Sequence, residues 1–156
     1  MDYAKLKALI DATPGTPEMS DAEVSAALCV QNISVLGKAP LWQVKQLLLE
    51  TGRWWALKLA AKTESAIQPV ADAAVEIISD PRFENIDMAN PVTQQMMGAL
   101  VQAGIITQEQ SDAVVAMATT LTSIAEQAGL GDPTPTDVGM ARGTIPMVQT
   151  EAKHDN

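Results

Sequence analysis

Helix-start signals and glycine or proline breaks divide this sequence into short segments, and this division limits the fold more than any other feature. Ser20 with Glu23 and Thr107 with Gln110 have the spacing of a capping box, in which two side chains satisfy free amides at a helix start. No segment shows the sustained alternation of apolar and polar residues that is typical of a strand, apart from a weak trace near the C-terminus. The pattern predicts an all-α fold, a compact helical bundle of about five to six helices.

The strongest helical pattern covers residues 40–62. Its apolar side chains recur on one face: Leu41, Val44, Leu48, Trp55 and Leu59. Gly52 lies on the same face, so either the helix breaks there or the glycine lets another helix approach closely. We expect one continuous helix, because glycine inside a helix costs only about 1 kcal/mol relative to alanine. Since adjacent helical side chains diverge by about 100°, Trp55 is expected in the core and Trp54 at an edge or partner surface.

A second long pattern, residues 107–129, predicts another helix that ends at Gly129. Its apolar residues also recur at steps of three and four: Val114, Met117, Leu121, Ile124 and Ala128. The two patterns together predict one core that contains the following residues: Leu48, Trp55, Leu59, Val114, Met117 and Leu121.

Composition and charge exclude several classes of protein. A chain of 156 residues with 47% hydrophobic content indicates one folded domain. The chain has 19 acidic and 10 basic residues, and its net charge of −9 repels phosphate backbones, so no direct nucleic-acid binding is expected. No apolar run approaches the roughly 18–20 residues that span a bilayer, and the first residues do not resemble a signal peptide. We therefore expect no membrane contact and synthesis in the cytoplasm.

Residue types that carry out catalysis or hold metals are sparse. His154 is the only histidine and lies near the end of the sequence, and Cys29 is the only cysteine. Neither is expected to act as a base or nucleophile, because no nearby group would orient or activate it. The carboxylates between residues 72 and 87 fit a solvated acidic surface better than a weak cation site or an acid–base pair. The sequence therefore predicts no enzyme, no cofactor and no metal.

The segment after Gly129 differs from the rest of the chain. Glycines and prolines exclude a continuous helix there: Gly131, Pro133, Pro135, Gly139, Gly143 and Pro146. Its apolar side chains nevertheless need a surface to cover them. We expect a helical domain over 1–129 and an extended, non-helical C-terminal arm over 130–156 that docks on a neighbouring subunit. The alternatives are packing on its own helices and a disordered terminus. The candidate partner-binding residues are Trp54, Val138, Met140, Arg142, Ile145, Met147 and Val148.

Three stretches of the sequence carry a resemblance to known proteins. They are "MDYAKLKALI" with "SDAEVSAAL", then "FENIDMANPVTQQMMGALVQAGIITQEQSDAVVAMA", and finally "GLGDPTPTDVGMARG". Together they resemble a group of small, poorly characterised proteins of tailed bacteriophages. The resemblance implies a phage origin and a place in the virion near the tail or neck.

The favoured function is a structural or assembly protein of a phage particle, made in the host cytoplasm and then part of the virion. Its expected partners are other phage structural proteins and copies of itself, with the C-terminal arm docking on a neighbouring subunit. The alternative is a soluble phage-encoded effector that binds and inhibits a host protein.

Overall fold

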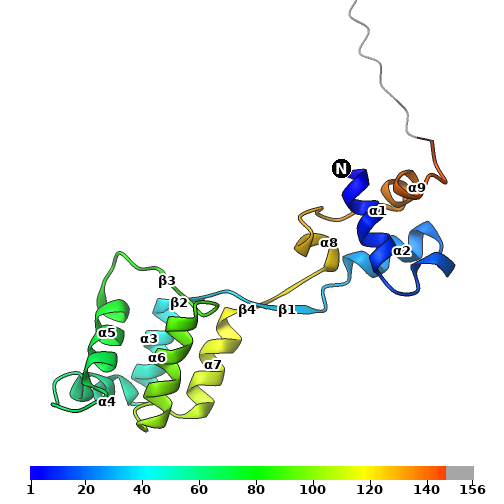
Figure 1. The fold of residues 1–156 in the computed structure, drawn as a ribbon. Coiled ribbons are helices and arrows are strands. Elements are labelled where there is room, and N and C mark those ends of the chain that lie inside the picture. Colours follow the sequence, from blue (N-terminus) through cyan, green and yellow to red (C-terminus); the bar gives the residue numbers. More distant parts are fainter. Residues whose placement is uncertain (147–156) are drawn as a thin grey trace, which may run out of the picture. The chain divides into compact units, whose positions relative to one another are not determined.

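A computed structural model describes residues 1–146 of the chain and is mostly helical, with two short two-stranded sheets. The chain forms two compact units, each with its own apolar core. Unit 2 is the continuous segment Ser34–Thr120, whereas unit 1 combines Met1–Ile33 with the chain from Leu121 onward (Figure 1). Both ends of the described chain therefore belong to unit 1. The boundary expected at Gly129 falls inside that unit.

Unit 1 consists of short helices around a small core. Its helices are α1 (Tyr3–Ala12), the 3-10 helix η1 (Thr16–Glu18), α2 (Asp21–Cys29), α8 (Ile124–Gln127) and α9 (Pro135–Arg142). The capping box of Ser20 and Glu23 is confirmed at the start of α2. Helix α9 packs against both α1 and α2. The buried residues of this core are Leu6, Ile10, Val24, Leu28, Ala125, Val138 and Ala141.

Unit 2 holds the larger core, between five helices and one strand pair. Its elements are β2 (Lys38–Pro40), α3 (Leu41–Glu50), α4 (Arg53–Ala60), α5 (Gln68–Ser79), β3 (Asn85–Asp87), α6 (Pro91–Gln102) and α7 (Gln108–Ala118). The capping box of Thr107 and Gln110 is confirmed at the start of α7. Strands β1 (Ile33–Leu36) and β4 (Thr119–Thr122) pair with each other where the chain leaves unit 1 and where it returns.

The expected continuous helix over residues 40–62 is wrong, because the chain breaks at Gly52. Gly52 adopts a left-handed conformation with φ of 72°, which separates α3 from α4 and changes the helical phase. As a result Trp54 is 6% exposed and lies in the core. Trp55 and Leu59 are 66% and 68% exposed, so their expected burial is also wrong.

The expected helix over residues 107–129 is interrupted as well. Helix α7 ends at Ala118, and the chain continues as strand β4 before α8 begins at Ile124. β-branched threonines occupy residues 119, 120 and 122, and such residues favour extended backbone. Leu121 lies in this strand and is 57% exposed, so it is not a core residue.

The expected extended arm is wrong for the residues that form α9. Pro135 occupies the first turn, where a missing amide costs nothing, and Gly143 ends the helix in a left-handed conformation with φ of 75°. Two of the residues that were expected to exclude a helix therefore mark its two ends. The segment packs on its own helices α1 and α2, which was one of the alternatives left open by the sequence.

Candidate functional site

The candidate partner-binding residues of the C-terminal segment lie within unit 1. Val138 is completely buried, and Met140 and Ile145 are partly buried. The Arg142 guanidinium donates to the Asp21 carboxylate and to the Met19 carbonyl, each at 2.9 Å. These side chains bind this chain rather than present a free surface. The other two candidates, Met147 and Val148, lie outside the described residues, as does His154.

The geometry of this segment comes from hydrogen bonds within unit 1. Thr134 and Asp137 form a capping box at the start of α9, and the bonds from Thr134 hold the pKa of the Asp137 carboxyl below its ordinary value. The Tyr3 hydroxyl also donates to Asp137, at 3.1 Å. The Ser25 hydroxyl donates to the buried carbonyl of Pro133 at 2.7 Å. The residues of this segment therefore cap α9 and pack within unit 1.

Gly139 permits the closest approach in this unit. A Cβ atom at this position would lie 2.6 Å from Cδ1 of Ile145 and 2.9 Å from Oδ2 of Asp21. Only glycine leaves room for both neighbours without displacing them. Close packing within the chain thus accounts for the presence of glycine at position 139.

Cys29 lies beside the same segment. Its Sγ atom is 3.7 Å from the Pro133 carbonyl. Burial raises the pKa of the thiol, and the nearby charges of Asp132 and Glu126 raise it further. The thiolate is disfavoured at neutral pH, which argues against a nucleophilic role.

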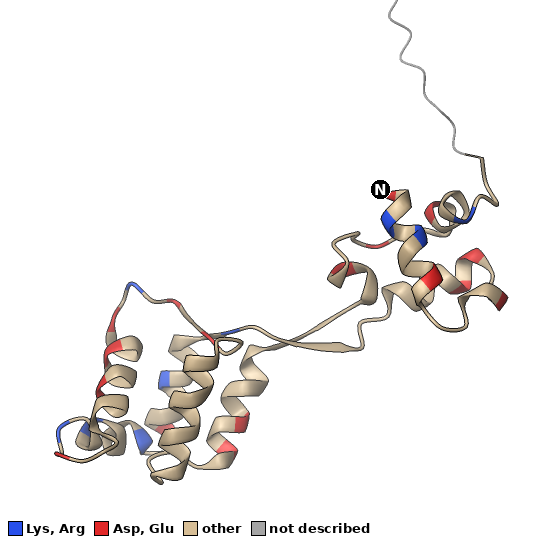
Figure 2. Cartoon of the chain, viewed as in Figure 1, with Lys and Arg blue, Asp and Glu red and all other residues tan. Residues whose placement is uncertain are grey.

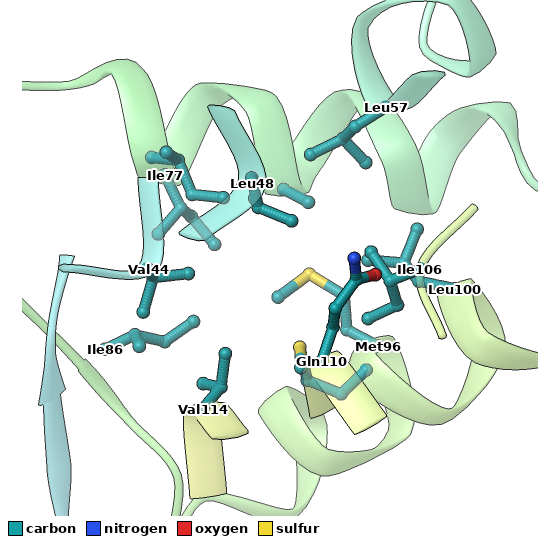
Figure 3. A pocket seen from close by; sticks show the side chains of 13 residues that line it. Val44, Leu48, Leu57, Ile77, Ile86, Met96, Leu100, Ile106, Gln110 and Val114 are labelled. Carbon is teal, nitrogen blue, oxygen red and sulfur yellow. The ribbon is translucent and has the colours of Figure 1, made fainter. Parts of the chain in front are cut away.

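An apolar cavity lies in the core of unit 2 (Figure 3). Its volume is about 30 Å³, whereas pockets that hold small-molecule ligands measure about 300–1,000 Å³. Every lining side chain except Gln110 is apolar, and the Gln110 carbonyl oxygen accepts the Thr107 amide at 2.9 Å. The cavity is therefore a gap in core packing rather than a ligand site.

The strand pair of unit 2 brings two exposed aromatic residues together. Strand β2 pairs antiparallel with β3, and the pairs include Pro40 with Asn85. The Leu41 amide continues this register by donating to the Glu84 carbonyl at 2.9 Å. Trp42 follows in the first turn of α3 and Phe83 precedes β3, and both line one surface hollow. The residues lining this hollow are Pro40, Leu41, Trp42, Phe83, Glu84 and Asn85.

We call this hollow the aromatic surface. Trp42 is 64% exposed and Phe83 is 51% exposed. An ordered turn presents Phe83, because its amide donates to the Asp80 carbonyl at 3.1 Å. The Asp80 carboxylate accepts the Arg82 amide at 2.9 Å and also binds the Arg82 guanidinium. These bonds hold the pKa of the Asp80 carboxyl below its ordinary value.

Acidic residues lie in and beside the aromatic surface. Figure 2 shows them along α5 and along the connector that follows it. A second hollow shares Phe83 and is lined by Glu76, Asp80 and Arg82, among others. Three of the carboxylates between residues 72 and 87, Glu76, Asp80 and Glu84, line these two hollows, and Asp80 forms an ion pair with Arg82. Within residues 1–146, no group of three His, Cys, Asp or Glu side chains is placed to hold a metal ion.

Sequence reasoning missed the aromatic surface. Trp54, the tryptophan expected at a partner surface, is buried beneath Lys45 and Lys58, whose Nζ atoms lie 5.5 and 5.7 Å from its ring centroid. Phe83 lies in a connector without a helical or strand pattern of its own. The sequence does place a large aromatic residue close to Pro40 and another close to Pro81. That the two lie near each other depends on strands β2 and β3, which are distant in sequence.

Comparisons with known proteins find no match for this chain. No protein family, curated protein or solved structure matches it. For the described residues, none of the helices has the length and apolar character required to span a bilayer.

Proposed function

We propose that this protein is a structural or assembly protein of a tailed-bacteriophage particle, and that it binds a partner protein through the aromatic surface of unit 2. The single observation that carries the binding role is the exposure of Trp42 and Phe83 in one surface hollow. Exposed apolar groups at such positions mark interaction sites, and tryptophan is enriched among residues that dominate binding energy. The sequence resemblance supports the phage setting.

The two-unit organisation is compatible with such a role. Unit 1 uses the C-terminal segment to complete its own core, so residues 130–146 are not the docking arm of this proposal. Unit 2 supplies the exposed aromatic residues. In this proposal the protein acts by binding other proteins of the particle and not by catalysing a reaction.

The experiment has two arms. Mass spectrometry of purified particles, produced from the genome that encodes the chain, should find the protein in a fixed copy number. Incorporation of Trp42→Ala should fall strongly, whereas Trp55→Ala should be incorporated normally. The control is matched, because Trp42 and Trp55 lie in the same unit and are 64% and 66% exposed.

Other outcomes would redirect or overturn the proposal. Absence from particles, together with binding to a host protein, would support the soluble effector instead. Loss of incorporation with Trp55→Ala but not with Trp42→Ala would move the contact to the exposed side of α4. Each variant should first be shown to keep the helical circular dichroism of the parent protein.

A further inference from the structure

The charge around the aromatic surface identifies the chemistry of its occupant. Glu84 lines the hollow that contains Trp42, and Glu76 lines the neighbouring hollow that shares Phe83. Both glutamates are exposed, and neither forms an ion pair within residues 1–146. The nearby Arg82 guanidinium is occupied, since its Nε donates to Asp80 at 3.0 Å. The surface therefore combines aromatic rings with uncompensated negative charge.

The three tryptophans differ in how their rings are covered. Lysine Nζ atoms lie 5.5 and 5.7 Å from the Trp54 ring centroid, and the Nζ of Lys58 lies 5.4 Å from that of Trp55. Trp42 has no such cation in the part of the chain that the structure describes. Aromatic faces attract ammonium and guanidinium groups, and nearby carboxylates strengthen this preference. The Trp42 ring is thus available to a cation from outside the chain.

We infer that the aromatic surface binds a positively charged segment of a partner protein, rich in Lys or Arg and containing apolar side chains. This inference rests on the proposed function and names the partner chemistry for the same site. Apolar side chains and the aliphatic stems of the basic residues lie against Trp42 and Phe83. The cationic groups of the segment lie over the Trp42 ring and near Glu76 and Glu84. A nucleic acid would meet repulsion from the same two carboxylates and from the chain's net charge of −9.

The test uses the full chain and three labelled peptides. The first peptide alternates Arg and Leu, and in the other two Gln or Glu replaces every Arg. Fluorescence anisotropy should detect binding of the Arg peptide, weaker binding of the Gln peptide and none of the Glu peptide. The affinity for the Arg peptide should fall with added salt, because exposed charges are screened over roughly 10 Å at 0.1 M.

Variants separate the aromatic and the electrostatic contributions. Trp42→Ala and Phe83→Ala should each weaken binding of the Arg peptide by roughly tenfold or more. The double variant Glu76→Gln/Glu84→Gln should weaken it several-fold and reduce its dependence on salt. The control double variant, Glu64→Gln/Glu109→Gln, changes the net charge equally at exposed positions of the same unit and should bind as the parent does.

Three results would overturn the inference. The first is equal binding of the Arg and Gln peptides, and the second is equal weakening by the two double variants. The third is a failure of every peptide to bind while the protein forms a dimer that Trp42→Ala abolishes, which would make a second copy the occupant.

Failure of this inference can be told apart from failure of the proposed function. If incorporation into particles needs Trp42 but tolerates Glu76→Gln/Glu84→Gln, the assembly role stands and the basic partner is rejected. If the Arg peptide binds as expected but incorporation does not depend on Trp42, the binding chemistry stands and the assembly role at this surface is rejected.

Discussion

The guanidinium of Arg142 lies 2.9 Å from the carboxylate of Asp21, a residue 121 positions earlier in the chain. This ion pair links the last turn of α9 to the first residue of α2. The Thr144 hydroxyl donates to the other oxygen of the same carboxylate at 2.8 Å. A single acidic side chain thus ties the C-terminal helix to the N-terminal half of unit 1.

The ion pair gives the first prediction. The two side chains are 22% and 25% exposed, so Arg142→Ala should lower the free energy of unfolding of unit 1 by about 1–3 kcal/mol. Lys7→Ala is the control, because it removes an ion pair whose side chains are 56% and 62% exposed, and it should change the same quantity by less than about 0.5 kcal/mol. Amide hydrogen exchange in α1 and α2 measures both effects. Equal effects of the two variants would contradict the prediction.

A second prediction concerns Gly139. Its replacement by alanine would place a Cβ atom 2.6 Å from the Ile145 side chain, so Gly139→Ala should destabilise unit 1 by about 1–3 kcal/mol. Gly98→Ala is the matched change in a helix interior where nothing lies within 4 Å of the added atom, and it should be neutral or stabilising by up to about 1 kcal/mol. Thermal unfolding followed by circular dichroism compares the two. A stable Gly139→Ala protein would mean that Ile145 moves aside freely.

Truncation after Gly129 tests whether the two units are independent. The truncated chain lacks α9, including the completely buried Val138, so unit 1 should unfold while unit 2 keeps its core. Cys29 reports on unit 1 and should react with a thiol reagent at the rate of an unfolded peptide. The three tryptophans all lie in unit 2 and should keep the fluorescence spectrum of the intact protein. Slow thiol reaction in the truncated chain would show that α9 is dispensable.

Two leucines of α4 provide a matched pair for the core of unit 2. Leu57 is 1% exposed and borders the cavity, whereas Leu59 is 68% exposed. Leu57→Ala should lower the free energy of unfolding by about 2–5 kcal/mol, and Leu59→Ala should change it by less than about 0.5 kcal/mol. Chemical denaturation followed by tryptophan fluorescence measures both. The reverse order of effects would restore the continuous helix expected from the sequence.

Acid should unfold unit 1 before unit 2. Hydrogen bonds hold the pKa values of Glu23, Glu126 and Asp137 below their ordinary values, and all three lie in unit 1, whereas Asp80 is the one such carboxyl in unit 2. Because the folded-state pKa values are the lower ones, their stabilising contribution is complete above the unfolded-state pKa values of about 4. It is lost as pH falls through the folded-state values. Backbone amide signals recorded during an acid titration should therefore disappear first from α1, α2 and α9.

A variant of the same experiment identifies the groups responsible. In Glu23→Gln/Glu126→Gln the side chains still accept the capping hydrogen bonds but no longer titrate, as Gln110 already does in the box with Thr107. This variant should lose less stability on acidification than the parent protein. Identical acid profiles would assign the effect to other carboxylates.

Local signals in the sequence predict part of this fold well. The capping boxes that begin α2 and α7 depend on residues three positions apart, and the structure confirms both. The wrong expectation of one continuous helix through Gly52 has a different origin. The residues on each side of Gly52 have a helical pattern, but the left-handed conformation of Gly52 rotates the second helix relative to the first. Burial of Trp54 and exposure of Trp55 follow from that single rotation.

Long-range contacts account for what the sequence did not reveal. Helix α9 contains Gly139 because α9 lies against Asp21 and Ile145, and a pattern of glycine and proline alone favours a non-helical arm. The aromatic surface depends on the pairing of β2 with β3, which are separated by three helices in the chain. The residues that flank Trp42 in the sequence do not indicate that Phe83 lies near it, and the converse is also true.

The construction of unit 1 from both ends of the chain has a consequence for biosynthesis. Helices α1 and α2 leave the ribosome well before Val138 and Arg142, which complete their packing. Unit 2 is continuous and can fold in the interval, which brings its own ends together, as the 2.9 Å bond from the Gly37 amide to the Ala118 carbonyl illustrates. Throughout that interval the nascent chain exposes the apolar side chains of Leu6 and Leu28. Until α9 is translated, α1 and α2 are thus open to chaperones and proteases.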